Sequence, residues 1–290
     1  MAYCVKGVAK PAYYGFMYGR ESIESFDVNV DVDSPILARE SARAWASIKY
    51  LKLAQIRDVY KVQNPENSIS APALDLSGMK KKWWETKIVA FDVETTGLDP
   101  QKNRIVEIAF SEMGDKEFQE PESYLLNEGR EIPAESSEIH GITNDMIKGK
   151  PSFDDVFEEI YEKYIKDTTL MVAHNKGFDH QFLVSSMKRN NYMRYVPPCV
   201  CTMEMGIMND MGQENNRLET LIELMGVDGI NSHRAGDDCR GSGNLFLKFA
   251  RRPGSVYNHK EATAMDIIQH LDDIRWPNEN SNMGFGNNWA

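Results

Sequence analysis

Between Trp83 and about Arg252, apolar runs of strand length alternate with amphipathic runs of helix length. This alternation is typical of an α/β domain, in which helices cover the faces of a β-sheet. The clearest strand candidates are KIVAFDVE (87–94), IVEIAF (105–110) and TLMVAH (169–174). Helices are expected at 153–165, 177–191, 217–226 and 233–250, and then at about 260–275. The chain is therefore expected to be globular, rather than a coiled coil or a disordered protein.

We expect three regions along the chain. Residues 1–82 form an accessory region that ends in a polar linker, QNPENSISAPALDLSG, followed by three lysines. Residues 83–252 form the α/β domain. Residues 253–290 form a C-terminal helix followed by a flexible tail rich in Asn and Gly.

A basic amphipathic helix is predicted within the accessory region, starting at Pro35 and ending near Lys61. Its apolar residues share one side, and Arg39, Arg43, Arg57 and Lys61 share the other. Such a face is either the solvated side of a packed helix or a surface that follows the phosphates of a nucleic-acid strand.

The charge balance argues against a protein that binds nucleic acid by bulk electrostatics. Lys and Arg number 33 against 44 Asp and Glu, which gives a net charge of −11. Nucleic acid would have to be drawn by metal ions or by local basic segments such as Lys80–Lys82 and Lys188–Arg189. Four cysteines without a regular framework indicate a reducing compartment. Because no long apolar segment is present, we expect a soluble, cytoplasmic protein with no membrane partner.

Asp92 and Glu94 stand near the end of an apolar strand, separated by one residue. The period of two in a β-strand places both carboxylates on one face. Two neighbouring carboxylates repel each other unless a proton or a cation lies between them. The pair therefore predicts a site for a hard divalent cation such as Mg²⁺.

Three further residues are candidates for the same site. Asp179 is expected at the start of a helix, where a carboxylate also interacts favourably with the helix dipole. His233 and Asp238 are five residues apart, so their side chains would diverge if both were on one helix. They can converge only if His233 precedes the helix, and a histidine placed there is a candidate general base.

Four motifs occur in a fixed order: FDVETTGL (91–98), HGIT (140–143), AHNKGFD (173–179) and HRAGDD (233–238). Together they resemble the DEDDh family of 3′–5′ exonucleases, the DnaQ-like group that includes polymerase proofreading exonucleases, RNase T and oligoribonuclease. The resemblance covers about residues 86–250. It implies a ribonuclease H-like α/β fold, a mixed sheet flanked by helices, here with an N-terminal helical extension.

The resemblance also assigns roles to individual residues. It makes Asp92, Glu94, Asp179 and Asp238 the metal-binding carboxylates and His233 the general base. The H-x-A-x-x-D form of the last motif selects Asp238 over its neighbour. Residues implied to contact the terminal nucleotide are Thr95, Thr96, Leu98, Asn175 and Phe178. Three glycines depart from the apolar, continuous final helix usual in the family and predict a weakened helix: Gly236, Gly241 and Gly243.

The implied activity is a metal-dependent 3′–5′ exonuclease that releases nucleoside 5′-monophosphates from single-stranded nucleic acid, with DNA favoured over RNA. Two divalent cations are expected as cofactors, Mg²⁺ with Mn²⁺ as a substitute, in a two-metal hydrolysis. Possible partners, bound through the N-terminal region or the tail, are a polymerase, a single-strand binding protein or a nuclease complex. The alternatives are an oligoribonuclease-like enzyme, a phosphodiesterase for small signalling oligonucleotides and a non-catalytic nucleic-acid-binding module. A zinc hydrolase or deaminase is more distant, and it would need Cys199, Cys201, Cys239 and His233.

Overall fold

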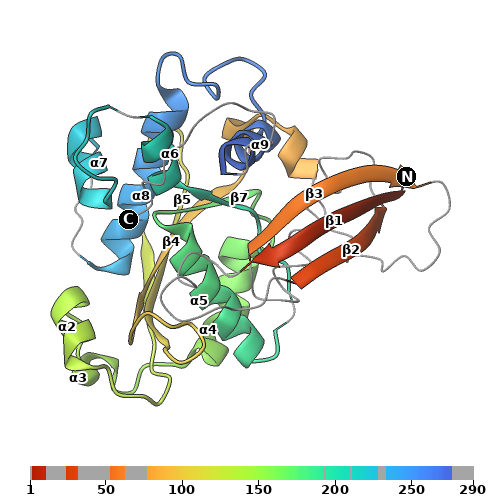
Figure 1. Ribbon diagram of the computed structural model, residues 1–290. Coiled ribbons are helices and arrows are strands. Elements are labelled where there is room, and N and C mark those ends of the chain that lie inside the picture. Colours follow the sequence, from red (N-terminus) through yellow and green to blue (C-terminus); the bar gives the residue numbers. More distant parts are fainter. Residues whose placement is uncertain are drawn as a thin grey trace.

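The computed structural model describes residues 2–10, 24–31, 53–62, 77–192, 194–209, 211–227 and 233–275. Its central feature is a five-stranded mixed sheet with the order β6-β5-β4-β7-β8 (Figure 1). The strands are β4 (Ile88–Thr95), β5 (Ile105–Glu112), β6 (Glu122–Leu125), β7 (Leu170–Ala173) and β8 (Cys199–Cys201). β4, β5 and β6 are antiparallel, whereas β7 and β8 run parallel to β4. The predicted α/β class and its three strand candidates are confirmed.

Helices cover both faces of this sheet. They are α2 (Ala134–His140), α3 (Asn144–Ile147), α4 (Phe153–Ile160), α5 (Lys176–Arg189), α6 (Thr202–Met208), α7 (Leu218–Met225), α8 (Ala235–Arg251) and α9 (Ala264–Arg275). Short helical turns are η2 (Ser77–Lys80), η3 (Trp83–Glu85) and η4 (Tyr161–Ile165), a π-helical continuation of α4. The five predicted helical segments within this part of the chain are confirmed. β6, β8, α2, α3 and α6 were not predicted, since each is too short to show a clear period.

Alternate residues of β4 separate the two layers of the core. Ala90 faces the layer built on α8, with residues of α6, α7 and α9, while Val89, Phe91 and Val93 face α4 and α5 (Figure 1). The period of two therefore directs Asp92 and Glu94 to the α8 side of the sheet. The fold thus determines which helix meets the predicted carboxylate pair.

The structure corrects the N-terminal helix prediction. Residues 53–62 form β3 (Leu53–Val62), which pairs with β1 (Ala2–Lys10), and β1 pairs in turn with β2 (Glu24–Asp31). The segment is rich in β-branched and aromatic residues, and antiparallel pairing satisfies its backbone groups. A β-bulge at Arg57 interrupts the alternation, which is why no strand period is visible in the sequence.

Arg57 and Lys61 therefore lie on a strand and not on a basic helical face. Arg39 and Arg43, with the first part of the predicted helix, lie outside the described residues, as does the predicted tail. The basic helical face that was predicted to bind a nucleic-acid strand is therefore not formed as predicted, because its C-terminal part is a β-strand. Among the described residues, no helix is long and apolar enough to cross a membrane.

Helix α8 is continuous, which corrects the expectation that its three glycines weaken it. α8 runs without interruption from Ala235 to Arg251. A Cβ added at Gly241 would lie 2.8 Å from Cδ1 of Ile222, and one added at Gly243 would lie 2.5 Å from the ring of Phe118. The glycines are thus positions where α8 closely approaches its neighbours, and tertiary packing overrides their low helix propensity.

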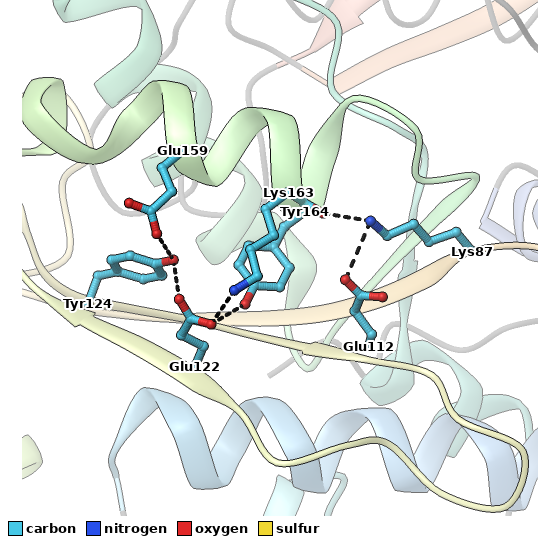
Figure 2. A network of polar contacts seen from close by, with 7 residues as sticks. All are labelled: Lys87, Glu112, Glu122, Tyr124, Glu159, Lys163 and Tyr164. Atoms are coloured by element: carbon cyan, nitrogen blue, oxygen red, sulfur yellow. Dashed lines mark hydrogen bonds and ion pairs between the residues drawn. The ribbon is translucent and has the colours of Figure 1, made fainter.

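A polar network on the opposite side of the sheet connects β6 to the end of α4 and to η4 (Figure 2). The Glu122 carboxylate accepts hydrogen bonds from the hydroxyls of Tyr124 and Tyr164 and from the Lys163 ammonium. Tyr124 also donates to Glu159. These bonds, first the one from Lys163, hold the pKa of Glu122 at about 2, so Glu122 is ionised at neutral pH.

Candidate active site

Asp92 and Glu94 lie on the last part of β4, on the face that meets α8. Glu94 pairs across the sheet with Glu107 of β5, and the register shifts at the next residue. Bulges of this kind redirect side chains at the end of a strand. The structure therefore places three carboxyl side chains, two predicted and one not, at one end of the sheet.

Asp238 joins this group from the first turn of α8. The ligand oxygens of Asp92, Glu94 and Asp238 all lie within 4.8 Å of one another. The three residues therefore converge, although they come from a strand and a helix far apart in the sequence. Its neighbour Asp237 is exposed and is not in the group, as the motif pattern had indicated.

Asp179 approaches the same end of the sheet from the first turn of α5. Its Oδ1 accepts the backbone N–H of Val93, between Asp92 and Glu94, at 3.2 Å. The carboxylate is buried, with 4% of its surface exposed. Asp179 therefore lies beside the pair, but outside the tight group of three oxygens.

The electrostatics of the group reflect uncompensated negative charge. Burial, followed by the charges of Asp179 and Glu94, raises the pKa of Asp92 well above its ordinary value. Burial and the charge of Asp238 likewise raise the pKa of Glu94. Burial also raises the pKa of Asp179, against the opposing effect of the Val93 hydrogen bond. A cation among these oxygens would reverse the penalty, so the donor set suits hard divalent metal ions.

His233 lies just before α8, which begins at Ala235. This is the arrangement that allows His233 and Asp238 to serve one site, because the two are not on the same helix. The side chain of His233 is exposed, and its backbone is left-handed with φ of 51°. Such a conformation is uncommon for a residue other than glycine and needs support from its surroundings.

Two residues that the sequence reasoning missed provide that support. The carboxylate of Glu107 is 1% exposed and pairs with both Nε (3.0 Å) and Nη2 (2.7 Å) of Arg234. It also accepts the Ala235 N–H at 3.1 Å. The residue after His233 and the first residue of α8 are therefore fixed to β5. A glutamate inside the apolar run IVEIAF was the available signal for a buried ion pair.

The turn after β4 carries the predicted contacts to a terminal nucleotide. Thr95 Oγ1 donates to the Gly97 carbonyl at 2.7 Å, and Thr96 Oγ1 accepts the Arg104 N–H at 3.0 Å. Gly97 has a φ of 147°, a region accessible mainly to glycine. Leu98 follows with 49% of its surface exposed. The turn is rigidly held, yet it presents an apolar side chain to solvent.

The start of α5 carries the other predicted contacts. Asn175 precedes the helix in a left-handed conformation with φ of 46°. Phe178 is half-buried, and its ring centroid lies 4.8 Å from that of Phe182. Both residues are thus fixed beside Asp179, although Phe178 is partly accommodated by the core.

The other two histidines of the motifs, His140 and His174, are packed inside the domain and hydrogen-bonded to its backbone. His140 of HGIT is buried, and its Nδ1 accepts the Ile142 N–H at 3.0 Å. His174 Nε2 donates to the Asn216 carbonyl at 3.0 Å, and its Nδ1 is 2.9 Å from the Thr202 hydroxyl. Burial lowers the pKa of both imidazoles. The neutral imidazole is favoured at both positions, and His174 connects segments that are far apart in the sequence.

The residues needed for a zinc site are not brought together. Cys199 and Cys201 lie on β8 and Cys239 lies on α8, all three buried, whereas His233 is exposed. Burial raises the pKa of each thiol, which disfavours the thiolate needed to bind metal. Within the described part of the chain, the metal-binding group is the carboxylate group.

Comparison with known proteins gives the same picture. The sequence pattern of the RNase_T family, described as exonuclease, matches residues 89–246. Among solved structures, exonuclease I from Methylocaldum szegediense has a TM-score of 0.52 at 19% identity, over 60% of this chain and 42% of that one. This likeness establishes the shared ribonuclease H-like fold.

Relatives in sequence include proteins named as DNA polymerase III. DNA polymerase III PolC-type of Thermotoga petrophila is 29% identical over 222 residues, which is 77% of this chain but 16% of that protein. DNA polymerase III subunit epsilon of Treponema pallidum is 32% identical over 189 residues, which is 63% of this chain and 87% of that protein. This chain thus spans only about a sixth of the length of the PolC-type relative. By its family match over residues 89–246, the chain belongs to the exonuclease family, in its DnaQ-like, DEDDh branch.

Proposed function

We propose that the chain is a 3′–5′ exonuclease that releases nucleoside 5′-monophosphates from the 3′ end of single-stranded nucleic acid, with DNA favoured over RNA. The observation that carries the proposal is the convergence of Asp92, Glu94 and Asp238 within 4.8 Å, at the site where Asp179 also ends. Family membership supports the reaction class.

The carboxylate group fits the divalent cations that the family implies. It offers several oxygens and no competing cationic side chain within the three-residue group, and its raised pKa values show the cost of leaving that charge uncompensated. Asp92, Glu94, Asp238 and Asp179 would hold the ions. When bound, two Mg²⁺ or Mn²⁺ ions would polarise the phosphodiester and stabilise the charge on the leaving oxygen.

His233 is proposed as the general base. A water molecule attacks the terminal phosphorus, the bond to the 3′-oxygen of the penultimate nucleotide breaks, and the imidazole of His233 accepts the proton of that water. An exposed imidazole can exchange this proton with solvent after each cleavage. The ion pair between Arg234 and Glu107 holds the adjacent backbone, so the base is positioned before substrate arrives.

The turn after β4 and the start of α5 are proposed to grip the last nucleotides. Leu98 is exposed in the turn that follows β4, and Phe178 directly precedes Asp179 on α5. Apolar and aromatic surfaces of this kind stack on any base, which suits an enzyme that removes successive nucleotides without regard to sequence.

The test is a time course on 5′-labelled single strands of DNA and RNA with the same sequence, in Mg²⁺, in Mn²⁺ and in EDTA. We expect a ladder that shortens one nucleotide at a time, faster on DNA, and no cleavage in EDTA. Asp92→Asn should reduce cleavage by a factor of at least about 10³, because it removes a ligand of the metal ions.

Asp237→Asn is the matched control, since it makes the same chemical change at an exposed carboxylate outside the group. It should cleave like the parent chain. Equal loss in both variants would refute the site assignment. Cleavage of dinucleotides alone would favour the oligoribonuclease-like or signalling-oligonucleotide activity, and binding without cleavage by the parent chain would favour the non-catalytic module.

A replicative polymerase is the proposed partner class. The relatives are named as DNA polymerase III proteins, and the PolC-type relative is far longer than this chain. A polymerase or a single-strand binding protein bound to this chain would bring it to a primer end. Co-purification of the tagged chain with a polymerase would support this partner, and its purification without any replication protein would oppose it.

A further inference from the structure

Three guanidinium groups converge on the turn that joins β4 to β5. Arg104 ends this turn, Arg130 follows β6, and Arg189 is the last residue of α5. The Lys102 carbonyl accepts hydrogen bonds from both Arg104 (3.0 Å) and Arg130 (3.3 Å). The Asn103 carbonyl accepts one from Arg189 at 3.4 Å. Residues from three separate segments thus place positive charge at one turn.

The positive charge of this cluster is only partly offset by the protein. The acceptors are neutral carbonyl groups, and no carboxylate in the described part of the chain forms an ion pair with any of the three. The nearby Glu128 attracts Arg104 and Arg189, but its carboxylate accepts the Phe153 N–H at 2.6 Å. Burial and mutual repulsion lower the pKa of Arg104 and of Arg189.

The cluster adjoins the candidate active site without being part of it. The Arg104 carbonyl accepts the N–H of Thr96, two residues after Glu94, and the Arg104 N–H donates to the Thr96 hydroxyl. Arg189 lies at the opposite end of α5 from Asp179, about 15 Å away along the helix axis. Arg130 is exposed, and the other two arginines are half-buried. An anion bound here would therefore be separate from the phosphate that is cleaved.

We propose that Arg104, Arg130 and Arg189 form a phosphate-binding patch for the substrate strand upstream of its 3′-terminal nucleotide. The inference rests on the proposed exonuclease function and adds a preference for longer strands. Planar guanidiniums match the geometry of phosphodiester oxygens, and contacts to phosphate are independent of base sequence. The patch replaces the basic helical face that the sequence had suggested for this task.

The size of the effect follows from counterion release. For single strands, each phosphate contact adds about 0.7 to the slope of log affinity against log salt. At 0.15 M salt, relative to 1 M, one contact is then worth about a fourfold gain in affinity. Loss of two contacts should weaken binding about 15-fold and lower the slope by about 1.4.

The experiment measures binding of fluorescein-labelled dT2 and dT16 by anisotropy, in EDTA to prevent cleavage, across a salt series. The full chain is compared with Arg104→Gln/Arg130→Gln, with the charge-retaining double Lys variant, and with Arg252→Gln. Arg252 is an exposed arginine beyond the far end of α8, so it removes a charge elsewhere. Circular dichroism verifies that each variant is folded.

We expect the Gln pair to lose about 15-fold in affinity for dT16 and much less for dT2, with a smaller salt slope. The Lys pair and Arg252→Gln should keep most of the dT16 affinity. Equal losses on dT2 and dT16, equal losses in the Gln and Lys pairs, or an unchanged slope would each overturn the patch. If the Gln pair fails to fold, Arg130→Gln alone should still lose about fourfold, and no loss would overturn the proposal.

Failure of the patch is distinguishable from failure of the proposed function. If the parent chain cleaves dT16 in Mg²⁺ but the patch substitutions do not change its affinity, the exonuclease proposal is supported and the patch is refuted. If the patch substitutions weaken dT16 binding but the parent chain cleaves no strand in Mg²⁺ or Mn²⁺, the patch is supported and the exonuclease proposal is refuted.

Discussion

Gly243 of α8 provides the sharpest test of how closely this helix approaches the sheet. In Gly243→Ala, the new Cβ would lie 2.5, 2.7 and 2.8 Å from three ring atoms of Phe118. Ordinary carbon contacts are about 3.5–4.0 Å, so the ring or the helix must move by about 1 Å. Phe118 is fully buried, and its N–H is bound at 2.8 Å by the side chain of Asn244, the residue after Gly243.

Two opposing contributions set the change in the free energy of unfolding. Alanine in a helix interior is favoured over glycine by about 1 kcal/mol. Overpacking a core costs about 1–3 kcal/mol, and the upper end applies because the clash involves three atoms of a held ring. We therefore expect Gly243→Ala to destabilise the chain by about 2 kcal/mol, although helix propensity alone predicts the opposite sign.

The assay is equilibrium unfolding in urea, followed by far-UV circular dichroism, for the parent chain and two alanine variants. The matched control is Gly177→Ala on α5, where the nearest atom to the new Cβ is 4.0 Å away. Gly177→Ala should be neutral or stabilised by up to about 1 kcal/mol. A Gly243→Ala chain as stable as the parent would refute the close-approach argument.

Two other predictions concern charged groups. Glu107→Gln should lower the free energy of unfolding by about 1–2 kcal/mol and slow cleavage, because the amide NH2 that replaces one carboxylate oxygen cannot accept a hydrogen bond from Arg234 and the guanidinium loses its charged partner. Urea unfolding and kcat measure this, and parent-like values for both would contradict it. Glu122 has a folded pKa of about 2 against an ordinary 4.5, so its stabilisation is full above pH 4.5 and lost as the pH falls toward 2. Because the Glu122 side chain is partly exposed, Glu122→Gln should lower the free energy of unfolding by only about 1 kcal/mol at pH 7. Thermal unfolding measures this, and a difference in Tm from the parent chain that persists at pH 2 would argue against the network.

β4 and its two carboxylates were predictable because they depend on local pattern. The run KIVAFDVE fixes both the strand and the shared face of Asp92 and Glu94. The choice of Asp238 followed from its motif. His233 was expected to precede the helix, because only then could His233 and Asp238 reach the same site, and it does precede α8. The shared face followed from the strand period alone, whereas the choice of Asp238 and the role of His233 rested on the resemblance to the DEDDh family.

The features that escaped prediction depend on contacts between distant segments. The strand at 53–62 is defined by pairing with β1 and is concealed by its bulge. Gly243 reads as a helix breaker until Phe118 is known to lie against it. The ion pair of Glu107 with Arg234 joins residues 127 positions apart, and its partner cannot be read from either segment alone.

The way the carboxylates are anchored has a consequence for folding. Asp179 reaches its hydrogen-bond donor across 86 positions of sequence, and Glu107 holds the start of α8 across 128. Such long-range contacts form late, after the loops between them have been closed. A nascent or partly folded chain would hold Asp92 and Glu94 on its sheet but lack the helices that bring Asp238 and Asp179 to them. The proposed nuclease activity would then require the docking of α5 and α8 onto the sheet as well as the formation of β4.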